Sequence, residues 1–342
     1  MTSLKSRRVR RTVGTGLSLA LVAGAGVAAT APLASAFAAA RASVVAPTAV
    51  TPKAATTPVS ARVVATPQLV VTPKALVASP CTGTAAISCE LFARTGTTTV
   101  KVSASSSPTL TVWKFSDTDT EAGAASAVLV GQVGVPMTIT LHNNLPVATP
   151  LRFSIPQLDG VHFTTSIAQG GTDTVTFTPD RAGTFTYQAG LGADGSRQVS
   201  MGLVGALVVR PNAAQPSVVP GDDANQTKGK AYDAQEQGYD DEAVLVYTDV
   251  DTRLAANPLG FSMRSWAPQY HLVNGQAYPD TQSVVSDAGR TVMLRVVNGG
   301  ILEKSPTLLG TRMTVVARGS RPLPTAMEVS GRLMNTGDTF DG

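Results

Sequence analysis

Long apolar runs, aromatic residues, histidines and cysteines are all scarce in this 342-residue chain. Outside the N-terminal region no segment has about 18 uninterrupted apolar residues, so we expect no other membrane-spanning helix. Aromatic residues make up only 5% of the chain, whereas Thr, Val, Ala and Gly dominate. This composition is typical of β-sandwiches with many turns.

The formal net charge of +4 does not describe the part that we expect to fold. Nine of the 27 basic residues and none of the 23 acidic residues lie within residues 1–80. The rest of the chain therefore has 18 basic residues against 23 acidic ones, a net charge of −5. A nucleic-acid-binding domain needs a basic patch of its own. We expect no nucleic-acid partner for this mildly acidic part.

Residues 1–36 have the features of an export signal. A basic start precedes an apolar stretch of small residues at 17–27, and the Ala-Ser-Ala at 34–36 fits a cleavage site. An amphipathic first helix is the alternative, which the glycines within 14–26 disfavour. Two arginine pairs leave both the general secretory and the twin-arginine route open. The sequence predicts a secreted or cell-envelope-associated protein.

Residues 37–80 consist of Ala, Thr, Pro and Val in loose repetition. Prolines remove backbone donors and bias their neighbours toward extended backbone. We expect a disordered or polyproline-like spacer, which would hold the folded part away from the membrane or cell wall.

The chain's two cysteines, Cys81 and Cys89, follow the spacer. In an oxidising compartment two cysteines at this spacing favour a disulfide. A soft-metal pair is the alternative, but two thiols with no histidine nearby make a poor site. A disulfide here closes a small loop, so it would pin the start of the first domain without contributing much stability.

Short alternating apolar and polar runs follow, and no helix-period stretch of convincing length interrupts them. They predict an all-β chain, with a Greek-key sandwich at 81–212 and a second β domain at 241–342. The polar residues 213–240 predict a linker between the two domains. The expected strands are residues 98–103, 109–115, 137–142, 151–155, 173–178, 184–188, 203–210, 243–248, 270–273, 291–297 and 312–317.

Seven stretches resemble, in the same order, segments of multicopper oxidases of the laccase-like, actinobacterial type. Residues 135–145 resemble the family's strand that ends in an Asn-x-Leu turn, and residues 182–187 resemble the strand that carries its second histidine pair. The resemblance implies two cupredoxin-like Greek-key β-sandwiches, the second of them incomplete. The other matching stretches are 159–161, 170–177, 202–209, 270–279 and 292–299.

At the positions that match the family's copper ligands, this chain departs from the family's pattern. Its first ligand pair has the form His-x-His-Gly, and here Arg152 and Ser154 stand in those places. Its second pair has the form His-x-His, and here Gln188 and Gly190 replace both ligands. Residues 301–305 likewise lack a histidine that some relatives carry. The family's copper centres need far more histidines than the three in this chain.

The three histidines, His142, His162 and His271, form no His-x-His or His-x₃-His pair. We interpret each of them as a surface or packing residue. The acidic residues within 117–121 alternate with threonines, which could suggest a calcium loop. The glycine and the distal glutamate of an EF-hand are missing, so a solvated acidic loop is the favoured interpretation.

The sequence therefore favours an exported, copper-free relative of multicopper oxidases. We expect a non-catalytic binding or structural module at the cell surface, with an unknown protein or cell-envelope partner. No cofactor and no catalytic or metal-binding residue is predicted. The alternative is a copper-dependent oxidoreductase completed by another chain or by missing sequence, and then copper would be the cofactor.

Two further expectations follow from the resemblance and the composition. The last residues, 335–342, resemble the start of a strand that further strands follow in the family, so a partner could complete the open sheet if the chain is truncated. A periplasmic copper carrier ranks last among the candidate functions, because the eight methionines are scattered.

Overall fold

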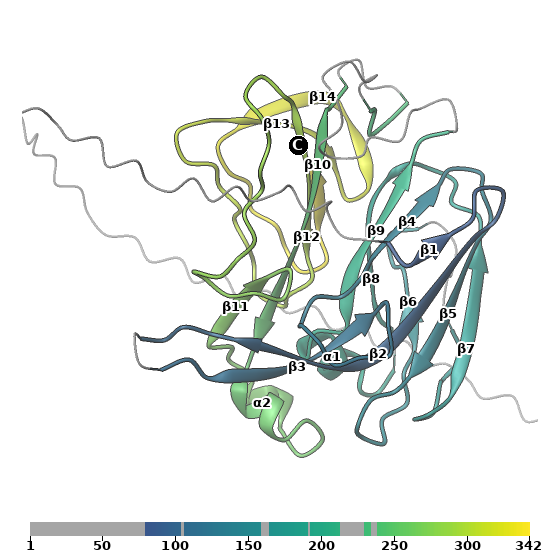
Figure 1. Cartoon of the computed structure of the whole chain (residues 1–342), viewed down its shortest axis with the longest axis vertical. Coiled ribbons are helices and arrows are strands. Elements are labelled where there is room, and N and C mark those ends of the chain that lie inside the picture. Colours follow the sequence, from purple (N-terminus) through teal and green to yellow (C-terminus); the bar gives the residue numbers. More distant parts are fainter. Residues whose placement is uncertain (1–78, 104–105, 159–163, 191, 213–228, 234–237) are drawn as a thin grey trace, which may run out of the picture. The chain divides into compact units, whose positions relative to one another are not determined.

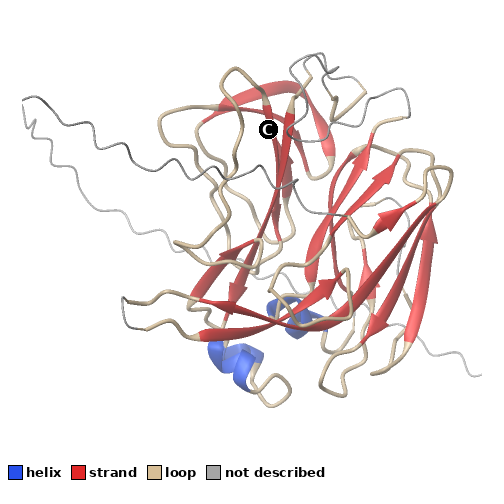
Figure 2. Ribbon diagram, in the orientation of Figure 1, coloured by secondary structure: helices blue, strands red, loops and turns tan. Residues whose placement is uncertain are grey.

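Extended segments with alternating buried and exposed side chains make up most of this chain. The computed structural model describes residues 79–342 except 104–105, 159–163, 191, 213–228 and 234–237. These residues belong to one compact unit, Pro67–Gly342. Figure 2 shows that strands predominate over helices, as the sequence predicts. The helical elements are α1 (Gly195–Ser200), α2 (Thr252–Ala256) and a 3₁₀ turn at Met263–Ser265.

The first sheet is built around one long strand, β2 (Ile87–Thr99). Its inward residues include Cys89 and Leu91, both buried, whereas Glu90 between them is exposed. β2 pairs antiparallel with β1 and β3 and parallel with β5, and β5 pairs in turn with β7. The partner strands are β1 (Cys81–Thr82), β3 (Thr109–Ser116), β5 (Met137–Asn143) and β7 (Thr172–Phe177).

A second sheet packs against the first and completes a sandwich. Its strand order is β4-β9-β8-β6, with β4 and β9 parallel and the other pairs antiparallel. Three aromatic rings from the two sheets, Phe115, Phe153 and Tyr187, lie with centroids 5.5 to 5.9 Å apart in the core. The strands are β4 (Val128–Gln132), β6 (Phe153–Ser154), β8 (Gly183–Ala189) and β9 (Val204–Arg210).

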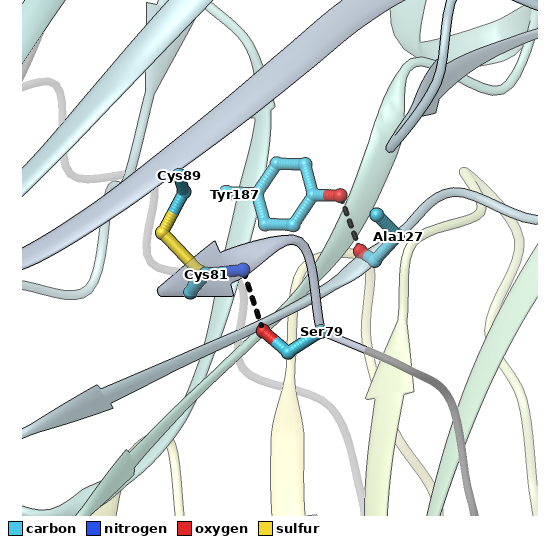
Figure 3. The surroundings of a disulfide bond; sticks show 5 residues. All are labelled: Ser79, Cys81, Cys89, Ala127 and Tyr187. Carbon is cyan, nitrogen blue, oxygen red and sulfur yellow. Dashed lines mark hydrogen bonds between the residues drawn. A yellow bond between two sulfur atoms is a disulfide. The ribbon is translucent and has the colours of Figure 1, made fainter. Parts of the chain in front are cut away.

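The predicted disulfide between Cys81 and Cys89 is confirmed, and Figure 3 shows its surroundings. The two cysteines face each other across the β1–β2 pair. The backbone N–H of Cys81 also donates to the Ser79 hydroxyl at 3.3 Å. Since Cys89 is 1% exposed and belongs to the sandwich core, the bridge fastens the start of the described chain to that core.

The remaining strands form one six-stranded sheet with the order β11-β10-β12-β15-β13-β14. β10 and β12 are parallel, and the other neighbours are antiparallel. One face of this sheet packs on the first sandwich, where Val244, Val246 and Val297 contact Val128, Ala206 and Val208 of β4 and β9. The strands are β10 (Asp241–Val250), β11 (Tyr270–Val273), β12 (Val292–Asn298), β13 (Met313–Arg318), β14 (Arg321–Val329) and β15 (Thr339–Asp341).

The strand predictions need three corrections. The strand predicted at 98–103 is wrong, because β2 runs from Ile87 and ends at Thr99. The strand β4, Val128–Gln132, is not among the expected strands. The strand β14 was not expected at all, because prolines are rare inside strands, and this one carries two at the edge of its sheet.

Several sequence predictions fall outside the described residues. The export signal at 1–36 and nearly all of the spacer at 37–80 do so, as does most of the linker at 213–240. The domain boundaries at 212 and 240 therefore stay predictions. Among the described residues, no helix combines the length and the apolar character needed to cross a membrane.

Candidate functional site

The structure brings together the four positions that the resemblance matches to copper ligands of multicopper oxidases. They are Arg152, Ser154, Gln188 and Gly190. In the β6–β8 pair, Phe153 lies opposite Ala189 and Ser154 lies opposite Gln188. The backbone N–H of Gly190 donates to the Arg152 carbonyl at 2.6 Å, which extends the pairing by one step. The core takes up the side chains of Phe153 and Ala189. Because side chains alternate along strands, the four matching positions share the opposite face.

This face of β8 is directed toward the six-stranded sheet. Thr186 and Gln157 reach the carbonyl of Gly337, at 3.3 Å and 2.6 Å respectively. Farther along the same face, the Thr184 hydroxyl donates to the Asp341 carboxylate at 2.6 Å. Gln188 continues this row of alternate residues. The four positions therefore lie beside the contact between the first sandwich and the six-stranded sheet.

The structure leaves little room for larger side chains at Gly190 and Ser154. A Cβ on Gly190 would come within 3.1 Å of the Ser154 Cβ and 3.2 Å of its hydroxyl. Ser154 is 1% exposed, and its hydroxyl donates to the Gln188 carbonyl at 3.5 Å. A larger side chain at either position would have to displace its neighbour.

The donor set does not fit copper. Copper sites in proteins use imidazole, thiolate and thioether ligands. The positive guanidinium of Arg152 repels a cation, and Gly190 has no side-chain ligand. The oxygen donors of Ser154 and Gln188 are hard and weak for copper. Among the described residues, no group of three or more His, Cys, Asp or Glu side chains could hold a metal ion.

The described histidines lie apart. His142 of β5 stacks on Phe92 with ring centroids 4.5 Å apart, and its two nitrogens lie 2.9 Å from Glu90 and Thr172. His271 of β11 lies 2.7 Å from the buried carboxylate of Asp249. The third histidine, His162, falls outside the described residues. The structure thus provides no pair of described histidines for a shared site.

Lys304 occupies the stretch where some relatives carry a histidine. Its ammonium donates to Asp249, the same carboxylate that His271 contacts, and lies 3.4 Å from the ring of His271. The backbone N–H of Leu302 also donates to Asp249 at 3.2 Å. This arrangement ties the loop after β12 to β10 and β11.

Two of the acidic residues at 117–121, Asp119 and Glu121, lie beside the guanidinium of Arg94. The Asp119 carboxylate accepts hydrogen bonds from Arg94 and from the Asn144 amide. The hydrogen bond from Asn144, together with Arg94, lowers the pKa of Asp119. Arg94 also lies 3.8 Å from Glu121. The guanidinium of Arg94 thus holds this solvent-exposed loop to β2.

A buried ion network that the sequence did not reveal lies at the same interface. Arg295 of β12 is fully buried and donates to Glu242 at 2.5 Å and to Asp341 at 3.0 Å. It also donates to Thr184 of the first sandwich at 3.2 Å. A second cation, Arg210 of β9, donates to Glu242 at 2.6 Å. Two arginines and two carboxylates thus join the first sandwich to the six-stranded sheet.

The arginines keep the Glu242 carboxylate of this network ionised. Burial alone would raise the pKa of Glu242, but Arg295 and Arg210 outweigh it and lower that pKa to about 2. Burial and the charge of Asp341 raise the pKa of Tyr232, which donates to Asp341 at 2.5 Å. Glu242 is therefore ionised and Tyr232 neutral near neutral pH, which suits a structural clamp better than proton transfer.

Comparisons with solved structures agree with this architecture. A blue copper oxidase from Nitrosomonas europaea is 17% identical with a TM-score of 0.57, over 74% of this chain and 74% of that chain. The multicopper oxidase mgLAC is 18% identical with a TM-score of 0.54, over 74% of each chain. The chain has a multicopper oxidase-like cupredoxin fold.

A related enzyme extends the comparison. The copper-containing nitrite reductase from Thermus scotoductus SA-01 is 16% identical with a TM-score of 0.52, over 74% of this chain and 54% of that chain. No protein-family model and no curated protein matches the chain. The cupredoxin-like fold expected from the sequence is thus confirmed, and the likeness lies in the fold.

Proposed function

We propose that this chain is an exported cupredoxin-fold protein that lacks copper ligands and acts as a non-catalytic binding or structural module at the cell surface. One observation carries the proposal. Arg152, Ser154, Gln188 and Gly190 converge on adjoining strands, and there they pack against one another without a suitable donor set. An enzyme that used copper at this place would need imidazoles with second-shell support.

Export is supported by the N-terminal sequence pattern and by the disulfide. A basic segment, an apolar stretch and a small-residue cleavage site precede the folded part. The bridge between Cys81 and Cys89 is of the kind that persists in oxidising compartments.

A binding role is supported by the apolar surface of the six-stranded sheet and its loops. Of the nine large hydrophobic residues that are exposed in the described part of the chain, eight lie within residues 259–333. Leu309 is 92% exposed, and Met327 lies on the edge strand β14. We take this concentration of exposed apolar residues in one half of the fold as support for an interaction surface there. The partner we propose is a protein or another component of the cell envelope.

Oxygen uptake tests the non-catalytic part of the proposal. Purified protein, dialysed with copper salt and then freed of excess copper, is given a phenolic substrate in an oxygen electrode. We expect no uptake above the rate of the buffer. Saturable uptake that disappears when a chelator removes the copper would contradict the proposal.

The second candidate is a copper-dependent oxidoreductase completed by another chain or by missing sequence. The chain's likeness in fold to a blue copper oxidase and a multicopper oxidase favours this candidate. Oxygen uptake that appears only when a histidine-rich chain from the same cells is added would support this candidate.

A further inference from the structure

Lys114 is a buried lysine that no carboxylate neutralises directly. It lies on β3 and is 3% exposed. Its ammonium donates to the backbone carbonyl of Ala122, a neutral acceptor. Since an ammonium has three donors, two remain without an acceptor among the described residues. The residue directly opposite on β2 is Arg94, a second cation.

The nearby carboxylates are engaged elsewhere or stay at a distance. Asp119 and Glu121 pair with Arg94. Asp117 acts on Lys114 through its charge, but the two form no ion pair. Burial lowers the pKa of Lys114, Arg94 lowers it further, and Asp117 and Glu121 only partly oppose them. A larger share of this amine is therefore neutral at a given pH than for an exposed lysine.

Lys114 lines a hollow of about 460 Å³. The turn after β11, including Gln276, also lines it. This volume is in the range of small-molecule sites. The lining mixes polar residues, among them Thr98, Ser116 and Asp117, with alanines and glycines.

The absence of a side chain at Gly96 leaves space for the side chain of Lys114. A Cβ on Gly96 would lie 2.3 Å from the Gly123 carbonyl and 3.0 Å from the Lys114 Cδ. Only glycine leaves space there for the lysine stem and for the segment that caps it. The chain thus holds this amine in one place beside the hollow.

We propose that Lys114 is a reactive amine that takes up small polar aldehydes covalently in this hollow. The neutral Nζ attacks the carbonyl carbon, and proton transfer from nitrogen to the former carbonyl oxygen gives a carbinolamine. Loss of water then leaves an imine between Nζ and the carbon. The reaction consumes no oxidant or reductant. The residues that line the hollow include threonines, serines, Asn274 and Gln276, which suits an aldehyde that carries polar groups.

Reductive trapping tests the proposal on the full exported protein. Glyceraldehyde serves as the probe, sodium cyanoborohydride reduces the imine, and peptide mass spectrometry follows each lysine over time at pH 7. Lys101, which is exposed and paired with Asp280, serves as the internal reference. Because a lowered pKa raises the neutral fraction of an amine at pH 7, we expect Lys114 to react faster than Lys101.

Two further measurements complete the test. In denaturant the rates at Lys114 and Lys101 should converge, because the hollow is gone. In the folded protein, the rate at Lys114 should level off at a lower pH than the rate at Lys101. Labelling of Lys114 that is no faster than that of Lys101, or a preference that survives unfolding, would overturn the proposal. A Lys114→Arg variant, which keeps the charge, confirms the assignment of the modified peptide.

Discussion

Gly190 and Ser154 lie so close that a Cβ on the glycine would come within 3.1 Å of the serine Cβ. Both residues stand where the resemblance to multicopper oxidases places copper ligands. At these positions β6 and the end of β8 therefore pack directly against each other. This proximity also makes the packing testable by substitutions that add a single carbon atom.

The first prediction concerns Gly190→Ala. Because the added methyl must push Ser154 aside, we expect the free energy of unfolding to fall by about 1 to 3 kcal/mol. Denaturant-induced unfolding measures it. Gly192→Ala is the matched control, since the nearest atom to its Cβ would be 3.9 Å away, and it should be nearly neutral. Equal effects of the two substitutions would show that the site around Gly190 has room.

The second prediction concerns the buried ion network. Arg295→Met leaves the carboxylates of Glu242 and Asp341 without their shared cation, and we expect a loss of about 3 to 5 kcal/mol. The control is Arg312→Met, whose pair with Glu328 spans 3.9 Å with both side chains 69% exposed. Such a surface pair should contribute less than about 1 kcal/mol. Similar losses in the two variants would contradict the assigned role of Arg295.

The third prediction concerns pH. The pKa of Glu242 is about 2 in the folded protein, below its ordinary value of 4.5, so the ionised form is stabilised by folding. That stability is fully present above pH 4.5 and is lost as the pH falls toward 2. The shift corresponds to about 3 kcal/mol.

Comparison with Glu242→Gln isolates this residue from other acidic groups. At pH 6 the native protein should be more stable than the variant, and the difference should shrink as the pH approaches 2. Chemical denaturation at a series of pH values gives both curves. A difference that does not change with pH would mean that Glu242 does not titrate in this way.

The fourth prediction concerns the disulfide. Thiol titration under denaturing, non-reducing conditions should find no free thiol. Replacing both cysteines with alanine should cost about 2 kcal/mol, because the bridge closes a short loop. Two free thiols in the purified protein would contradict the bridge.

Local sequence patterns predicted much of the fold because strands bury alternate residues. The run at 137–142 became β5 and the run at 270–273 became β11 with little change. β2 was displaced in the prediction because small residues, Cys89 and Ala93, occupy inward positions where a large apolar residue gives a clearer signal. The prolines of β14 hid an edge strand, because prolines are rare inside strands.

Contacts between distant segments were harder to foresee. The only local signal for the ion network was an arginine, Arg295, in the middle of the apolar strand β12. Its partners Glu242 and Asp341 lie 53 and 46 residues away, so their pairing depends on strand order. The sequence did align Arg152, Ser154, Gln188 and Gly190 with two ligand pairs. It could not show that Gly190 and Ser154 pack closely against each other, because that depends on the pairing of β6 with β8.

Copper content tests the central claim most directly. The purified protein is dialysed with a small excess of copper, passed through a desalting column and analysed for metal per chain. We predict no stoichiometric copper and no intense blue absorption, because Arg152, Ser154, Gln188 and Gly190 offer no suitable donor set. One or more copper ions retained per chain, together with that absorption, would contradict the account.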